Sequence, residues 1–329
     1  MPRSITRRLM LAALAATVAG AAPALAQGAA GYPARTVTII VPFPPGGTTD
    51  ITARQIAAAL TKSLGQTFIV ENKPGANGNI GSAQVARAAP DGYTLLMSGV
   101  GSNAVNHGIY SNMPYDSKKD FAHVSLATTG PNVLIVNPAF PAQTLKELIE
   151  IVKKEPGKYN YGSAGNGASG HMAMELLKTL SGMKIDHVPY KGGAPALQDV
   201  MAGVLPMMFT NQDLAFAQAK AGKVRIIGVA SLERNPAMPN APTIAEQGFP
   251  GFAAVSWNGI SAPAGTPRPI LDKLQQNIKL AFEEPELKKK LLENGFVPEA
   301  STPEVYQKFV ADEMDKWTKV AKDAGAKVD

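Results

Sequence analysis

The fold class follows from one segment, Thr36-Val37-Thr38-Ile39-Ile40-Val41-Pro42-Phe43-Pro44-Pro45-Gly46-Gly47-Thr48-Thr49-Asp50. The part from Thr36 to Val41 is rich in β-branched residues and predicts a strand buried on both faces of a sheet. The prolines and glycines that follow predict a turn, after which Thr49 or Asp50 caps a helix with an apolar stripe at Ile51, Ile56, Ala57 and Leu60. A strand, a turn and a helix in this order indicate the first unit of a parallel α/β sheet.

The same unit recurs along the chain. Predicted strands at 67–70 and 93–97, a loop at 73–81 and a helix at 82–89 complete the sheet of a first lobe. A second α/β lobe accounts for predicted strands at 133–136, 159–161, 184–188, 205–209 and 224–229 and for predicted helices at 145–154, 171–180 and 194–202. An extended segment at 252–260 is expected to return the chain to the first lobe. The residues after Pro267 are mostly amphipathic helix, broken at Pro285 and Pro303.

Residues 1–26 are predicted to be a secretory signal peptide. Arg3, Arg7 and Arg8 precede an apolar run at 9–18, and Ala24-Leu25-Ala26 has the small-x-small pattern of a signal-peptidase site. The apolar run is shorter than the roughly 20 residues that a helix needs to cross a bilayer. Export by the general secretory (Sec) route or by the twin-arginine (Tat) route remains open, and the expected location is the periplasm. The lobes are predicted to be 27–131 plus 254–329 (lobe 1) and 132–253 (lobe 2).

The composition excludes several classes of protein. The formal net charge is +6, and three of the arginines belong to the predicted leader, so the remaining charge is too small for a nucleic-acid-binding surface. The chain has no cysteine, which excludes disulfides, thiolate metal ligands and a cysteine nucleophile. No metal or cofactor is expected. His171 and Glu175, which have helical i, i+4 spacing, are interpreted as a pair on a helix surface.

Two common catalytic motifs are absent from the sequence. Neither a G-x-S-x-G nucleophile elbow nor a G-x-x-x-x-G-K-[ST] phosphate loop occurs, and no nucleophile is paired with a base. We therefore predict a binding protein and not an enzyme. A ligand sensor for a membrane signalling system and an exported hydrolase are the alternatives.

The turn from Phe43 to Asp50 is the first candidate site. Its glycines, Gly46 and Gly47, allow backbone N–H groups to converge on an anion at the positive end of the following helix. A simpler interpretation is a strand-to-helix turn with a good cap. That interpretation explains less readily why two prolines, two glycines and two threonines occur together.

The segment Gly162-Ser163-Ala164-Gly165-Asn166-Gly167-Ala168-Ser169-Gly170 also follows a predicted strand and begins a helix. Its last six residues fit the dinucleotide pattern G-x-G-x-x-G, and Asp186 lies near the spacing of a ribose contact. The motif falls in the second lobe of an exported protein and Asp186 is predicted to lie mid-strand, so we favour a second small-anion loop with hydroxyls at Ser163 and Ser169. The turn after His187 carries Lys191 and is either a third such site or a solvated turn.

Six motifs, in this order, resemble one family over the whole mature chain: VPFPPGGTTD (41–50), ENKPGANGNIG (71–81), PDGYTL (90–95), YGSAG (161–165), VPYKG (188–192) and WNGISAPAGTP (257–267). The family is that of the extracytoplasmic solute receptors of tripartite tricarboxylate transporters, also called the Bug family. The resemblance implies a type II periplasmic-binding-protein fold, in which two α/β lobes joined by two crossover segments close on a ligand. It also implies a small carboxylate ligand, membrane permease subunits as partners, and a monomer.

In such receptors the loop that matches Phe43 to Asp50 takes one carboxylate through backbone amides and ordered waters. Loops that match Ser98, Ser163 to Ser169 and Asn211 take the other end. The ligand-binding residues predicted for this chain are Phe43, Pro44, Pro45, Gly46, Gly47, Thr48, Asp50, Asn77, Ser98, Gly99, Ser163, Asn166, Ser169, Tyr190 and Asn211. The ligand class stays broad: a mono-, di- or tricarboxylate, including aromatic acids and amino acids.

Overall fold

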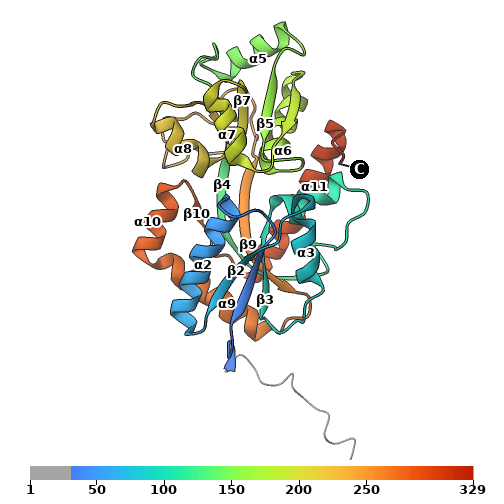
Figure 1. Cartoon of the computed structure of the whole chain (residues 1–329), viewed down its shortest axis with the longest axis vertical. Helices are drawn as coiled ribbons and strands as arrows, with labels where there is room; N and C mark the ends of the chain where they lie inside the picture. Colours follow the sequence, from blue (N-terminus) through green and yellow to red (C-terminus); the bar gives the residue numbers. More distant parts are fainter. Residues whose placement is uncertain (1–30, 329) are drawn as a thin grey trace, which may run out of the picture.

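A computed structural model describes residues 31–328, and the predicted signal peptide at 1–26 lies outside them. Two α/β lobes follow one another along the long axis of the molecule (Figure 1). The predicted fold class, two α/β lobes with a cleft between them, is confirmed. No helix of the described part of the chain is both long and apolar enough to span a membrane.

Lobe 1 is built on the parallel strands β2 (Phe68–Asn72), β1 (Val37–Val41) and β3 (Thr94–Gly99), in that order. Ile39 packs with one hydrophobic cluster and Ile40 with another, which confirms a first strand buried on both faces. Figure 1 shows helices on both sides of these strands. The helical elements of this lobe are α2 (Thr48–Leu64), η2 (Ala76–Gly78), α3 (Asn79–Ala86), the π-helix η3 (Gly101–Val105), α4 (Asn106–Ile109), α9 (Arg268–Glu283) and α10 (Pro285–Glu293).

Lobe 2 has the parallel strands β7 (Met207–Asn211), β5 (Asn160–Ser163) and β6 (Asp186–Pro189), with β8 (Arg225–Val229) beside β4. Its helices are α5 (Leu145–Lys154), α6 (Ser169–Ser181), α7 (Gly193–Ala202) and α8 (Gln212–Lys220). The sequence predicted the first three of these helices and missed α8. The apolar stripe of α8 is weak, because only Ala215 and Phe216 of its apolar residues are buried.

Two long strands cross between the lobes. They are β4 (Phe121–Val136) and β9 (Val255–Pro263). Strand β4 pairs with β9 as far as Pro131 and with β7 from Asn132 onward. The change of partner at this point supports the predicted lobe boundary, which stays a prediction. The sequence had marked only the last residues of β4 as a strand, because His123, Ser125 and Gly130 interrupt the apolar pattern. A minor strand, β10 (Val297–Pro298), also pairs with β4.

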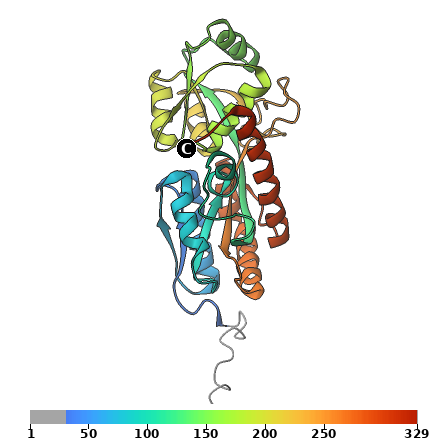
Figure 2. The same cartoon turned by 90° about the vertical axis from the view of Figure 1, so that its right-hand side faces the viewer.

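The C-terminal helix α11 (Pro303–Ala324) joins the lobes from one side (Figure 2). It contacts β4 and α6, and one hydrophobic cluster includes residues of α11 together with residues of both lobes. At its centre the buried Glu313 accepts hydrogen bonds from the indole nitrogens of Trp257, at 3.0 Å, and Trp317, at 2.8 Å. A carboxylate thus satisfies two buried donors on different elements.

We expect Glu313→Ala to lower the free energy of unfolding by about 3 kcal/mol, because two buried indole N–H groups lose their acceptor. Urea denaturation followed by tryptophan fluorescence measures the change. The exposed Glu293→Ala is the control and should change stability by no more than about 0.5 kcal/mol. Equal stability of the two variants would show that the Glu313 carboxylate is not needed at this junction.

Candidate ligand-binding cleft

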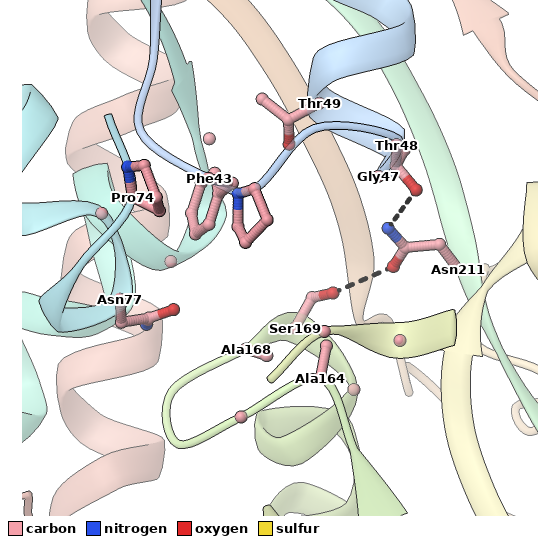
Figure 3. A pocket seen from close by; sticks show the side chains of 18 of the residues that line it. Phe43, Gly47, Thr48, Thr49, Pro74, Asn77, Ala164, Ala168, Ser169 and Asn211 are labelled. Carbon is pink, nitrogen blue, oxygen red and sulfur yellow. Dashed lines mark hydrogen bonds between the residues drawn. The ribbon is translucent and has the colours of Figure 1, made fainter. Parts of the chain in front are cut away.

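A cleft of about 850 Å³ lies between the lobes. Loops that follow β1, β5, β6 and β7 line it, so the carboxyl ends of strands from both lobes face the same space. Figure 3 shows the Phe43 loop on one side and the loop of Ala164, Ala168 and Ser169 on the other. The predicted site residues that line the cleft are Phe43, Pro44, Pro45, Gly46, Gly47, Thr48, Asp50, Asn77, Gly99, Asn166, Ser169 and Asn211.

The glycine turn is shaped by Asp50 in a way that the sequence did not predict. Helix α2 starts at Thr48 with Gly47 as its N-cap and no side-chain cap, so the predicted capping by Thr49 or Asp50 is wrong. Asp50 lies within the first turn instead, where its carboxylate accepts from the Gly46 N–H at 2.9 Å and from Asn72 Nδ2 at 2.9 Å. Gly46 has φ +81°, which a glycine adopts without strain.

Asp50 therefore holds the turn and does not contribute a donor to the cleft. Burial alone would raise the pKa of its carboxyl group, but hydrogen bonds from Arg54, Gly46 and Asn72 lower it below the ordinary value. The Gly46 N–H is already bonded to Asp50. The first backbone hydrogen bond of the helix runs from Ile51 N to Gly47 O at 3.0 Å, so the N–H groups of Gly47, Thr48 and Thr49 come before it and have no partner within the helix. Such N–H groups are available to an anion.

Four helices begin at the cleft. They are α2 in lobe 1 and α6, α7 and α8 in lobe 2, and residues of the first turn or the N-cap of each one line the cavity. A helix N-terminus carries a partial positive charge of about half an elementary unit. Among the described lining residues, Lys191 alone has a cationic side chain. The carboxylate of Asp50 also lines the cleft, so the partial positive charge there comes mainly from the helix N-termini.

Hydrogen bonds already connect the lobes across the cleft. The Thr48 hydroxyl donates to the Asp213 carboxylate, at 2.9 and 3.0 Å, and accepts from Asn211 Nδ2 at 2.8 Å. Ser169 Oγ donates to Asn211 Oδ1 at 3.2 Å, which extends the chain of contacts into α6 (Figure 3). Burial raises the pKa of Asp213, while the hydrogen bond from Thr48 acts in the opposite direction. These side chains thus link the two lobes directly.

Three predicted site residues do not line the cleft. Ser98 is fully buried in lobe 1, where its hydroxyl contacts Gly259 O and the hydroxyls of Ser261 and Tyr306. The Tyr190 hydroxyl donates to Asp199 at 2.5 Å. Ser163 is buried with its hydroxyl 2.6 Å from His187 Nε2. Ser98 lies within β3, Ser163 is the last residue of β5, and Tyr190 follows β6. Side chains alternate between the two sides of a strand, and these three hydroxyls have protein partners.

Other lining residues were missed or left undecided by the sequence. Pro74 and Trp257 line the cleft without having been predicted to do so. Thr49, Ala164 and Ala168 also line it; they lie within the predicted loops 43–50 and 163–169 but were not among the predicted ligand-binding residues. Lys191 also lines it, which supports the interpretation of its turn as part of the site over that of a solvated turn. The signal that points to Ala164, Ala168 and Lys191 is the Gly-rich strand-to-helix turn in which each occurs. Small apolar side chains carry no further signal by themselves.

The dinucleotide alternative for the loop 165–170 lacks its acidic ribose contact. A Cβ atom on Gly170 would lie 2.3 Å from Phe209 O, so this glycine is required by the close packing of α6 on β7, with or without a dinucleotide. Asp186 is the first residue of β6, exposed and away from the cleft, and not mid-strand as predicted. No group of three or more potential metal ligands is found within residues 31–328.

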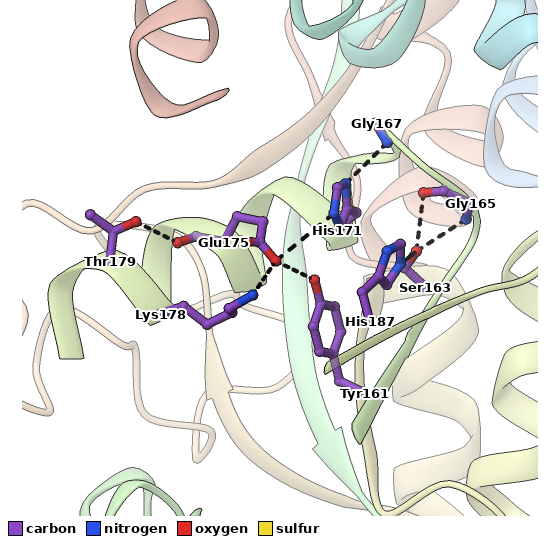
Figure 4. Close-up of polar contacts among 9 residues, drawn as sticks. All are labelled: Tyr161, Ser163, Gly165, Gly167, His171, Glu175, Lys178, Thr179 and His187. Carbon is purple, nitrogen blue, oxygen red and sulfur yellow. Dashed lines mark hydrogen bonds and ion pairs between the residues drawn. The ribbon is translucent and has the colours of Figure 1, made fainter. Parts of the chain in front are cut away.

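A histidine pair, His171 buried and His187 half-buried, lies directly behind the loop 165–170 (Figure 4). His171 and His187 stack with their ring centres 4.1 Å apart, and His171 Nδ1 accepts from the Gly167 N–H at 3.1 Å. Glu175 is also buried and accepts from Tyr161 and Lys178, at 2.6 and 2.7 Å. The prediction that His171 and Glu175 lie on a helix surface is therefore wrong, because this face of α6 packs against β5 and β6.

The Ser163–His187 contact is a hydroxyl–imidazole pair, so the expectation that no nucleophile is paired with a base is wrong. Two features oppose a catalytic role. Ser163 has no exposed surface, and burial together with the neighbouring His171 lowers the pKa of His187 to about 3, which makes it a weak base near neutral pH. The pair instead fixes the loop, because Ser163 Oγ also accepts from the Gly165 N–H at 3.1 Å.

The two histidines make the stability of lobe 2 depend on pH. Burial lowers the pKa of His171 to about 4 and that of His187 to about 3, whereas both titrate near 6.5 in an unfolded chain. The unfolded state therefore binds more protons below pH 6.5, and stability falls as the pH drops from about 6.5 toward 4. His187→Gln should reduce this loss between pH 7 and pH 4.5 by on the order of 2 kcal/mol in urea titrations. An unchanged loss would show that His187 does not titrate in this range.

Known proteins similar to this chain include solute-binding proteins with the same two-lobed fold. A family profile described as "Tripartite tricarboxylate transporter family receptor" matches residues 52–326. The chain is 35% identical to the protein BugT of Bordetella pertussis over 320 residues, which cover 97% of this chain and 98% of BugT. Two solved structures from Rhodopseudomonas palustris superpose closely.

The first of these structures, Rpa4515 with adipate, has a TM-score of 0.86 and 38% identity, and the match covers 90% of this chain and 100% of that one. The second, MatC with bound malate, has a TM-score of 0.82 and 35% identity, and the match covers 88% and 99%. These matches extend over nearly the whole described part of the chain and include both lobes. The chain therefore belongs to the tripartite tricarboxylate transporter receptor (TctC or Bug) family of periplasmic solute-binding proteins.

Proposed function

We propose that this receptor captures a small dicarboxylate between its lobes and delivers it to the membrane permease subunits of a tripartite tricarboxylate transporter. The observation that carries the proposal is the convergence of four helix N-termini, from both lobes, on one cleft. The related structures with adipate and malate support the dicarboxylate class. The predicted leader at 1–26 supports export to the periplasm by the Sec or the Tat route.

The donors of the cleft fall into two groups, which suits a ligand with two charged ends. In lobe 1, the N–H groups of Gly47, Thr48 and Thr49 face one carboxylate. In lobe 2, the N-termini of α6, α7 and α8 and the side chain of Lys191 face the other. A monocarboxylate would leave one of these groups without an anion.

Neutral donors also suit a receptor that must give up its ligand. Among the described lining residues no arginine is present, and a carboxylate held mainly by N–H groups avoids the strong bidentate pairing that arginine forms. A micromolar complex corresponds to about −8 kcal/mol. The permease then receives the ligand when the lobes open.

Lobe closure depends on the contacts of Thr48. Its bonds to Asp213 and Asn211 join α2 of lobe 1 to α8 and β7 of lobe 2, so they exist only when the lobes are close together. A ligand held by N–H groups of both lobes favours the same closed state. Closure of the lobes is then the signal by which the permease distinguishes the loaded receptor from the empty one.

The dicarboxylate class is tested by thermal unfolding of the mature protein. We expect a dicarboxylate of four to six carbons, such as succinate, malate or adipate, to raise the midpoint, because a ligand at about 100 times its dissociation constant adds roughly 2.7 kcal/mol. Acetate, glucose and inorganic phosphate should have no effect at the same concentration. A shift with glucose or phosphate but with no dicarboxylate would overturn the proposal.

The role of Thr48 is tested by Thr48→Val, which keeps the size of the side chain and removes the hydroxyl group. We expect dicarboxylate affinity to fall about 10-fold or more in calorimetric titration, because the closed state loses its contacts with Asp213 and Asn211 and becomes less populated. The control is Thr52→Val, one turn further along α2, whose hydroxyl bonds only to Thr48 O. If both variants bind like the wild type, closure does not depend on Thr48.

A further inference from the structure

Asn77 places a side-chain amide on the lobe 1 wall of the cleft. It belongs to η2 and has left-handed backbone angles, φ 48° and ψ 39°, which asparagine tolerates better than most residues. Two glycines from opposite lobes make room for the amide. A Cβ atom on Gly101 would lie 3.1 Å from Asn77 Nδ2, and one on Gly167 would lie 2.6 Å from the same atom. These contacts enclose the amide nitrogen, while the Asn77 side chain as a whole is partly exposed to the cleft.

The orientation of this amide is fixed by the hydrogen bonds of the fully buried Asn106. Asn106 Nδ2 lies 3.0 Å from the main-chain oxygen of Asn77, and a carbonyl oxygen only accepts hydrogen bonds. The nitrogen of the Asn106 amide must therefore be on this side, where it also donates to Asn79 Oδ1 at 2.7 Å. Its oxygen is then the atom that accepts from Asn77 Nδ2 at 2.7 Å. Consequently Asn77 Oδ1 is the atom that remains for the cleft.

Asn77 Oδ1 is an acceptor in a cleft whose walls otherwise present mostly donors. In Figure 3 the oxygen of Asn77 points into the space between the Phe43 loop and Ala168. No residue within 31–328 donates a hydrogen bond to it. A carboxylate oxygen of the ligand has no proton to offer and would be repelled at this point. The position therefore needs a donor.

We infer that Asn77 Oδ1 accepts a hydrogen bond from a hydroxyl or amino group on the ligand, so that the preferred ligand is a hydroxy- or amino-dicarboxylate. This inference rests on the proposed function and narrows its ligand class. The two carboxylates occupy the donor groups at the two ends of the cleft, and the substituent between or beside them meets Asn77. An unsubstituted dicarboxylate leaves this acceptor without a partner on the ligand, which costs affinity relative to a ligand that supplies the donor.

The first test compares ligands that differ only in the donor. Calorimetric titration of the wild-type protein with succinate, fluorosuccinate, malate and aspartate separates the contribution of a donor from that of size, since fluorine cannot donate. Two further pairs repeat the comparison for longer dicarboxylates: glutarate with 2-hydroxyglutarate, and adipate with 2-hydroxyadipate. At the length that binds best, we expect the hydroxy acid, the amino acid or both to bind about 10-fold more tightly than the unsubstituted acid. Fluorosuccinate should bind like succinate.

The second test assigns the preference to Asn77. Asn77→Gly removes the amide and keeps a residue suited to the left-handed backbone, so the loop is expected to keep its conformation. The ratio of the affinities for the substituted and the unsubstituted acid should fall from about 10 to near 1. Asn294→Ala, on the exposed end of α10, is the matched control and should keep the wild-type ratio.

The outcomes distinguish this inference from the proposed function. If the wild type binds dicarboxylates with no preference for a donor, or if Asn77→Gly keeps the preference, the role of Asn77 is refuted while the dicarboxylate receptor stands. If neither member of any pair binds, both fail. The wild-type comparison gives its answer even if the variant does not fold.

Discussion

The site depends on one constraint, which is that the first N–H groups of a helix have no partner within the helix. In this receptor four helices begin at the same cleft, because each follows a strand whose carboxyl end points toward it. Such an arrangement concentrates partial positive charge without burying a fixed cation. The turns that make this possible differ in detail: Asp50 shapes the turn before α2, whereas close packing against Phe209 requires Gly170 at the start of α6.

Behind the cleft, buried polar side chains set the positions of groups that face the ligand. His171 and Ser163 receive hydrogen bonds from the N–H groups of Gly167 and Gly165 and so shape the loop of lobe 2. In lobe 1, Asn106 accepts a hydrogen bond from the side chain of Asn77 and donates one to its main-chain oxygen, and so orients the amide of Asn77. In both places the donor–acceptor pattern presented to the ligand is decided by residues that do not line the cleft.

The relation between the lobes rests on two kinds of contact. The strands β4 and β9 and the helix α11 join them permanently, through a hydrophobic cluster and through the carboxylate of Glu313. The contacts of Thr48 with Asp213 and Asn211 are instead small and polar, and water can replace them when the lobes separate. This combination allows a stable protein to open its site without unfolding either lobe.

The sequence by itself determined the two α/β lobes, the glycine-rich turns and part of the cleft lining, because strand-to-helix turns with Gly, Pro and hydroxyl residues have a local signature. It could not place Ser98, Ser163 and Tyr190 correctly, since one residue along a strand decides whether a side chain meets the cleft or the core. Only the tertiary structure revealed that Asp50 bonds to Gly46, that His171 and Glu175 are buried, and that Asn106 leaves Asn77 Oδ1 on the side of the cleft. Each of these depends on partners from other turns, strands or helices, whose proximity no local pattern specifies.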